Sequence, residues 1–317
     1  MTIQILLLLL GFALLVKGAD WLVNGSVSLA KHYNLSELAI GLTIVAFGTS
    51  SPELLVNIIA SIKGYNDVAM GNIVGSNIFN LMFILGLSGM IYPLSVQSKT
   101  VWKEFPLSLL AAVLIILLAN NWFTVKPLAV LSRIDGILFI ALFLFCLLYI
   151  ARSIRSDKIV LESEYKIYKP LWTIIFIATG LIALIFGSKL VVNNAVKIAQ
   201  LLGVTEKLIG LTIVSVGTSL PELVTSVVAV IRKRADIAIG NVIGSNIFNV
   251  FFILGISAVI NPIKYNLQFN LDILILIVST ILLFIAMFVC RRHKLDRWQA
   301  ILLAIGYIVY ILYVINQ

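Results

Sequence analysis

Charged residues are scarce in this sequence. Asp, Glu, Lys and Arg make up 12% of its 317 residues, whereas 61% are hydrophobic and the mean hydropathy is +1.10. Because a soluble globular chain carries about 25% charged residues, this composition excludes a cytosolic enzyme. A membrane-spanning helix needs about 20 apolar residues, so the chain has room for about ten such helices. The composition therefore predicts an all-α, polytopic membrane protein.

Cysteine and histidine are also rare. The two cysteines, Cys146 and Cys290, each lie inside an apolar run, which gives neither a disulfide framework nor metal-ligand spacing. His32 and His293 fall in predicted loops, so we expect no imidazole within the membrane. The net charge of +9 would suggest nucleic-acid binding in a soluble protein, but in a membrane protein it indicates basic cytoplasmic loops. We expect no nucleic-acid partner.

Ten hydrophobic runs are separated by charged or turn residues. They cover residues 3–24, 36–62, 67–91, 103–121, 132–151, 170–195, 206–231, 236–260, 270–290 and 297–315. One long polar stretch divides them five and five. We therefore expect a first five-helix unit over residues 1–151, a linker over 152–169 and a second five-helix unit over 170–317.

The two units contain an internal repeat. Residues 41–89 align with residues 210–258 at a constant offset of 169, with 28 identities in 49 positions. The segment GLTIVAFGTSSPELL recurs as GLTIVSVGTSLPELV, and GNIVGSNIFNLMFILG recurs as GNVIGSNIFNVFFILG. Because each unit crosses the bilayer an odd number of times, the second copy must enter it in the opposite orientation. The sequence thus predicts two inverted five-helix repeats.

Basic residues are distributed unevenly between alternate loops. Fifteen Lys and Arg residues lie on the side that holds the 152–169 linker, and seven lie on the other side. Loops rich in Lys and Arg stay in the cytoplasm. We therefore expect a cell (inner) membrane protein with a cytoplasmic linker and both termini outside.

Two carboxylates, Glu53 and Glu222, lie near the middle of apolar runs. A charge at the centre of a membrane helix costs about 2.5–3.5 kcal/mol on insertion scales, so both residues are functional candidates. Each ends the same hexapeptide, GTSSPE or GTSLPE. Its proline cannot donate to the carbonyl four residues back, and the proline ring clashes there. Each hexapeptide therefore predicts a broken helix at the bilayer midplane.

The two breaks predict clusters of oxygen atoms. Backbone oxygens around Ala46 to Gly48, and around Ser215 to Gly217, lose their helical partners and must face protein, water or an ion. At helical spacing they share a face with the side chains of the hexapeptide. These side chains are Thr49, Ser50 and Glu53 in the first half, and Thr218, Ser219 and Glu222 in the second.

The second motif adds a polar stripe to the following helix. Side chains four residues apart share one helix face. The two stripes are Asn72, Ser76 and Asn80, and Asn241, Ser245 and Asn249. Such side chains can complete an ion site or can bond neighbouring helices to one another, and the spacing leaves both roles open.

Every candidate donor atom is an oxygen. Ca²⁺ takes about six to eight oxygen ligands in irregular geometry, whereas Zn²⁺ and Cu²⁺ favour Cys or His. Two inverted sites that meet at the midplane can be reached alternately from either side, which favours a carrier over an open pore. A hydrolase with Ser50 or Ser219 as nucleophile would need a base and an oriented partner, and no membrane histidine is present. A structural scaffold would leave the mirrored motifs without a purpose.

The doubled GTS-x-PE and GN-x-x-GSNIFN motifs on ten apolar segments resemble the sodium/calcium exchangers of the cation/calcium exchanger superfamily, in particular its prokaryotic branch. The resemblance covers the whole chain. It implies a secondary antiporter, not an enzyme, in which Na⁺ entering down its gradient expels Ca²⁺ by alternating access. The first helix of each half would slide across the other eight. The partners implied are the two transported ions and the lipid bilayer, with no cofactor and no obligate protein partner.

At matching positions the resemblance also implies the ion ligands. They are the side chains of Thr49, Ser50, Glu53, Ser76, Asn80, Thr218, Ser219, Glu222, Ser245 and Asn249, with the backbone oxygens of Ala46 and Ser215. Asn249 stands where some prokaryotic members look to have Asp, so a third titratable group is absent. H⁺/Ca²⁺ exchange and K⁺-dependent Na⁺/Ca²⁺ exchange on the same fold therefore stay open as alternatives.

Overall fold

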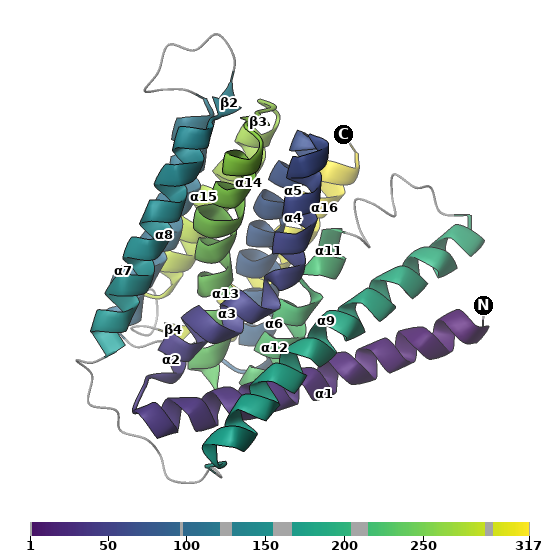
Figure 1. Cartoon of the computed structure of the whole chain (residues 1–317), viewed down its shortest axis with the longest axis vertical. Helices are drawn as coiled ribbons and strands as arrows, with labels where there is room; N and C mark the ends of the chain where they lie inside the picture. The colour runs from purple at the N-terminus through teal and green to yellow at the C-terminus, as the bar shows by residue number, and fades with distance from the viewer. Residues whose placement is uncertain are drawn as a thin grey trace.

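The computed structural model describes residues 2–95, 98–120, 129–154, 167–203, 215–288 and 294–316, and within these ranges the protein is almost entirely helical (Figure 1). The first half contains, in order, α1 (Thr2–Tyr33), α2 (Glu37–Ile40), the π-helix η1 (Gly41–Val45), α3 (Ala46–Thr49), α4 (Ser51–Lys63), α5 (Asn66–Ile78), the π-helix η2 (Phe79–Ile84), α6 (Leu85–Ile91), β1 (Leu94–Ser95), α7 (Ser98–Ala119), β2 (Val130–Leu131) and α8 (Arg133–Ile154). The second half contains α9 (Pro170–Leu201), α11 (Ser215–Thr218), α12 (Leu220–Ile231), α13 (Ala235–Ile247), the π-helix η4 (Phe248–Leu254), α14 (Gly255–Ile260), β3 (Ile263–Lys264), α15 (Phe269–Ala286), β4 (Lys294–Leu295) and α16 (Arg297–Ile315).

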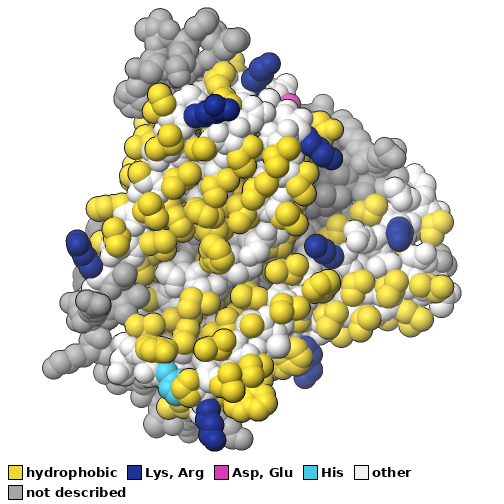
Figure 2. Space-filling view, in the orientation of Figure 1, with side chains coloured by type: hydrophobic (Ala, Val, Ile, Leu, Met, Phe, Trp, Pro, Cys, Tyr) yellow, Lys and Arg dark blue, Asp and Glu magenta, His cyan; other side chains and the backbone are white. Residues whose placement is uncertain are grey.

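The helices have the length and polarity of membrane spans. Seven described helices are long and apolar enough to cross a bilayer, and the bent pair Glu37–Thr49 and Ser51–Lys63 makes an eighth span. The shorter apolar helices Glu104–Ala119 and Leu220–Ile231 lie within two further predicted runs; the start of the run at 206–231 lies outside the described residues. Hydrophobic side chains cover most of the face in Figure 2. The protein is a multi-pass membrane protein.

The two halves are interleaved. Helix α6 of the first half packs on α16 of the second, and its repeat counterpart α14 of the second half packs on α8 of the first. In the same way α5 packs on α15, and its counterpart α13 packs on α7. Two short antiparallel strand pairs repeat the pattern, with β1 pairing with β4 and β2 pairing with β3. These contacts therefore recur with the roles of the halves exchanged, as expected for two related copies around a pseudo-two-fold axis.

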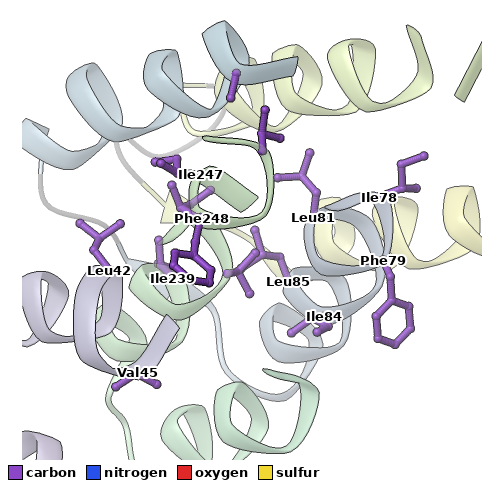
Figure 3. Packing of buried hydrophobic residues seen from close by; sticks show 14 of the residues in the cluster. Leu42, Val45, Ile78, Phe79, Leu81, Ile84, Leu85, Ile239, Ile247 and Phe248 are labelled. Atoms are coloured by element: carbon purple, nitrogen blue, oxygen red, sulfur yellow. The ribbon is translucent and has the colours of Figure 1, made fainter. Parts of the chain in front are cut away.

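The core is built from both halves. Figure 3 shows Leu42 and Leu85 of the first half in one buried layer with Ile239, Ile247 and Phe248 of the second. Within this layer η1 packs directly on α13. Glycines at the contact let the two backbones approach closely, as small residues do between membrane helices.

The helices α1 and α9 form a pair that crosses the rest of the bundle obliquely (Figure 1). They are antiparallel and meet at glycines: a Cβ on Gly18 would lie 2.8 Å from the Gly180 carbonyl oxygen, and a Cβ on Gly180 would lie 2.8 Å from that of Gly18. Near the linker, Ser28 Oγ and Thr173 Oγ1 share a hydrogen bond of 2.7 Å. We call α1 and α9 the crossed pair.

We expect Gly244→Ala to destabilise the protein by about 1–3 kcal/mol, because the added Cβ would lie 2.6 Å from the Leu42 carbonyl oxygen and 2.7 Å from Leu42 Cα, which are backbone atoms that cannot rotate away. The control is Gly306→Ala, whose Cβ would meet the terminal methyl of Met82 at 2.8 Å, a flexible group that can move. The measurement is the thermal unfolding midpoint of both variants in detergent. Equal midpoints would contradict the packing described for η1 and α13.

Candidate ion-binding site

Both hexapeptides break their helices at the same residue. In the first half α3 ends at Thr49, Ser50 has φ −80° and ψ 9°, and α4 starts at Ser51. In the second half Ser219 has φ −88° and ψ 9° between α11 and α12. Pro52 and Pro221 lie in the first turn of α4 and α12. The N–H groups of a first turn have no partner within their own helix, so the missing N–H of proline costs no hydrogen bond there. The first break bends the span by 47°, which confirms the predicted broken helix.

Each glutamate is bonded by the serine of the opposite half. Ser50 Oγ donates to Glu222 Oε1 at 2.8 Å, and Ser219 Oγ donates to Glu53 Oε1 at 2.9 Å. Ser219 Oγ also lies 3.0 Å from Ser76 Oγ. All five side chains are almost fully buried, with at most 2% of their surface exposed. The two hexapeptides therefore meet inside the bundle, and neither half completes the cluster alone.

Five buried oxygen atoms of this cluster and of the polar stripes lack a hydrogen-bond partner among the described residues. They are Glu53 Oε2, Glu222 Oε2, Asn80 Oδ1, Asn249 Oδ1 and Ser245 Oγ. Burying a polar atom without a partner costs about 1–3 kcal/mol, and more for a charged group. All five belong to residues predicted as ion ligands. A cation bound among them would satisfy atoms that the protein itself leaves unpaired.

A second hydrogen-bond network contacts the backbone at Glu222. Asn241 Nδ2 donates to the Glu222 carbonyl at 3.2 Å and to Ser226 Oγ at 3.0 Å, while its Oδ1 accepts from Thr49 Oγ1 at 3.0 Å. Thr49 thus bonds the opposite half, as Ser50 does.

The related network in the first half is looser. Asn72 Nδ2 lies 3.4 Å from the Glu53 carbonyl and 2.7 Å from Asn57 Oδ1, and Thr218 Oγ1 lies 3.4 Å from Asn72 Oδ1. Asn72 and Asn241 were not among the predicted ligands. Their place in the duplicated polar stripe was the feature of the sequence that pointed to them. In the structure they bond the backbone and the threonines of the hexapeptides.

The two predicted backbone ligands stay predictions. The Ala46 carbonyl, expected to be free, accepts from Ser50 N at 3.0 Å and from Thr49 Oγ1 at 3.4 Å, because α3 continues to Thr49 and the N–H of Ser50 still reaches it. Ser215 begins α11, and its side chain lies outside the described part. The Gly217 carbonyl, also expected to be free, accepts from Ser188 Oγ of the crossed pair at 2.7 Å.

The chemistry of the cluster suits a hard cation. Its described polar atoms are carboxylate, hydroxyl and amide groups, and the described ion pairs, Asp20–Arg232 and Glu37–Arg234, involve neither Glu53 nor Glu222. Two carboxylates in a low-dielectric interior repel each other unless a positive charge lies between them. Oxygen atoms with irregular geometry and two negative charges match the ligands that Ca²⁺ prefers.

Comparison with known proteins identifies this arrangement. The profile of the family described as "Sodium/calcium exchanger protein" matches residues 3–152 and 172–316. The chain is 32% identical to the sodium/calcium exchanger MaX1 of Methanosarcina acetivorans over 98% of each chain, and 33% identical to the inner membrane protein YrbG of Escherichia coli over 96% of this chain and 94% of that one.

A solved structure also matches over the full length. The sodium-calcium exchanger NCX_Mj superposes with a TM-score of 0.84 at 32% identity, covering 98% of each chain. This match confirms the predicted fold, ten transmembrane helices in two inverted repeats. The family consists of transporters, so the hydrolase alternative is excluded. The chain belongs to the sodium/calcium exchanger protein family, in its prokaryotic branch.

Proposed function

We propose that this protein is a secondary active antiporter that exchanges Na⁺ for Ca²⁺ by alternating access. The observation that carries the proposal is the reciprocal bonding of Ser50 to Glu222 and of Ser219 to Glu53, in which the second carboxylate oxygen of each glutamate has no partner among the described residues. One set of oxygen atoms serves both hard cations, so Na⁺ and Ca²⁺ compete for it. Competition for one site that opens to alternate sides produces exchange.

Relatives support this assignment of ions and membrane. MaX1 is named a sodium/calcium exchanger, and NCX_Mj crystals were soaked with Na⁺ and Ca²⁺ or with Na⁺ and Sr²⁺. YrbG is named an inner membrane protein. We place this protein in the cell (inner) membrane, with the linker in the cytoplasm and both termini outside, because the linker side holds fifteen Lys and Arg residues against seven.

We expect Glu53→Gln and Glu222→Gln each to abolish Na⁺-dependent Ca²⁺ uptake, because each removes one of the two charges that balance a divalent ion. The assay is uptake of radioactive Ca²⁺ into Na⁺-loaded proteoliposomes. Asp272→Asn is the matched control, since Asp272 bonds Tyr310 and an amide oxygen can still accept that hydrogen bond.

The same assay separates the alternative ion couplings. Uptake that ignores Na⁺ but follows a pH gradient indicates H⁺/Ca²⁺ exchange, and uptake that also requires K⁺ indicates co-transport. Full activity in both glutamine variants would reject the site itself.

The crossed pair donates a hydrogen bond to the second helix break through a residue whose repeat counterpart has no donor. This difference bears on alternating access because it makes the two access states unequal in energy. Ser188 donates to the Gly217 carbonyl, whereas the repeat counterpart of Ser188 is Ala19, which has no hydroxyl to donate to Gly48. Exchanging the conformations of the two halves would therefore lose this hydrogen bond. The sequence favours the state described here over its mirror.

An ion pair is biased in the same direction. Arg232 Nη2 lies 2.5 Å from Asp20 Oδ1, which links the crossed pair to the end of α12. The repeat counterparts of these residues are Lys63 and Lys189, two like charges that could not form such an ion pair in the mirrored state. The ion pair is partly exposed and contributes little by itself, so the buried Ser188 bond is the larger effect.

We expect Ser188→Ala to change the ratio of the apparent Ca²⁺ affinities at the two membrane faces by about two- to tenfold, the equivalent of one hydrogen bond. Ala19→Ser should move the ratio in the same direction, because it supplies the mirrored donor. Affinities are measured separately at each face in vesicles of defined orientation. Thr179→Val is the control, since Thr179 Oγ1 bonds Ile175 of its own helix. An unchanged ratio in both variants would contradict the bias.

A further inference from the structure

Asn77 and Asn246 form a reciprocal pair where α5 and α13 meet. Asn77 Nδ2 donates to the Asn246 backbone carbonyl at 3.3 Å, and Asn246 Nδ2 donates to the Asn77 backbone carbonyl at 3.2 Å. Both side chains are buried. A backbone carbonyl can only accept, so these contacts fix which end of each amide is nitrogen. The amide oxygen of each residue must then point elsewhere.

Each fixed oxygen accepts from an asparagine of the predicted ion site. Asn77 Oδ1 accepts from Asn249 Nδ2 at 2.9 Å, and Asn246 Oδ1 accepts from Asn80 Nδ2 at 3.1 Å. Turning either ligand amide around would set two oxygen atoms against each other. The ligand nitrogens are therefore held away from the site.

Holding the amide nitrogen of Asn80 and of Asn249 in place also determines where the amide oxygen of each residue lies. Asn80 Oδ1 and Asn249 Oδ1 are buried and have no partner among the described residues. An amide oxygen can bind a cation, whereas an amide nitrogen presents hydrogen atoms that repel it. The orientation of the side-chain amide therefore decides whether each asparagine can bind a cation.

We propose that Asn77 and Asn246 are positioning residues that hold the amide oxygens of Asn249 and Asn80 toward the transported cation. The inference rests on the proposed function and deepens it. The action is crossed: Asn77 of the first half orients Asn249 of the second, and Asn246 of the second half orients Asn80 of the first.

A second, partly buried asparagine pair shows an ordinary hydrogen-bonded contact between two helices of this protein. Asn120 Nδ2 donates to Asn270 Oδ1 at 2.8 Å, and Asn270 Nδ2 donates to Asn120 Oδ1 at 3.1 Å. In that pair each side-chain oxygen accepts from the partner amide, and Asn270 Oδ1 also accepts from Tyr265 Oη at 2.7 Å. The Asn77–Asn246 pair uses backbone carbonyls, and this choice leaves both side-chain oxygens available to orient neighbours.

The test measures Ca²⁺ affinity of the purified full-length protein by calorimetry, with KM and kcat for exchange in proteoliposomes. We expect Asn77→Leu and Asn246→Leu to weaken Ca²⁺ binding by about 10- to 100-fold, as loss of residues that orient metal ligands does, with KM changing more than kcat. Asn120→Leu is the matched control and should lower the unfolding temperature without changing affinity. Asn77→Ala replaces Asn77→Leu if the larger side chain prevents folding.

Combined variants separate positioning from a structural role. In the Asn249→Ala background Asn77→Leu should cause no further loss of affinity, whereas in the Asn80→Ala background it should cause its full loss. The reverse holds for Asn246→Leu. Equal losses in both backgrounds, or wild-type affinity in the single variants, would overturn the inference while leaving the proposed function intact. A wild-type protein that neither binds nor exchanges Ca²⁺ would overturn both.

Discussion

Two carboxylates buried close together in a membrane protein repel each other and lose their hydration, and this constraint governs the architecture of the site. The protein meets part of that cost with hydroxyl donors from Ser50 and Ser219. Glu53 Oε2 and Glu222 Oε2 have no hydrogen-bond partner among the described residues, and the proposed cation would fill that role. The serine at each helix break, Ser50 or Ser219, is the residue that reaches the glutamate of the other half.

Hydrogen bonds between the two halves connect the residues of the candidate site. Serine bonds glutamate, threonine bonds asparagine, and asparagine bonds asparagine, each time from one half to the other. A shift of one half against the other would therefore disturb these hydrogen bonds together. Glycines at the contact of η1 with α13 keep the two backbones close enough for these short side chains to meet.

Symmetry is kept in the ligand residues and broken around them. The glutamates, serines and stripe asparagines predicted as ion ligands recur in both halves, as a single ion site shared between two inverted repeats would require. The crossed pair carries Ser188 against Ala19 and Asp20 against Lys189. Small differences of this kind can set the balance between two conformations.

Apolar length, duplication, proline chemistry and residue type can be read along the chain, and they predict the membrane class, the repeat, the broken helices and the oxygen character of the site. The folded structure was needed to show which serine bonds which glutamate, that Ser188 donates to the Gly217 carbonyl, and that Asn77 and Asn246 accept hydrogen bonds from other amides. Those pairings join residues more than 140 positions apart in most cases, as with Ser50 and Glu222 at a separation of 172. Spacing along a helix predicts which side chains share a face, but it carries no information on which face of another helix lies opposite.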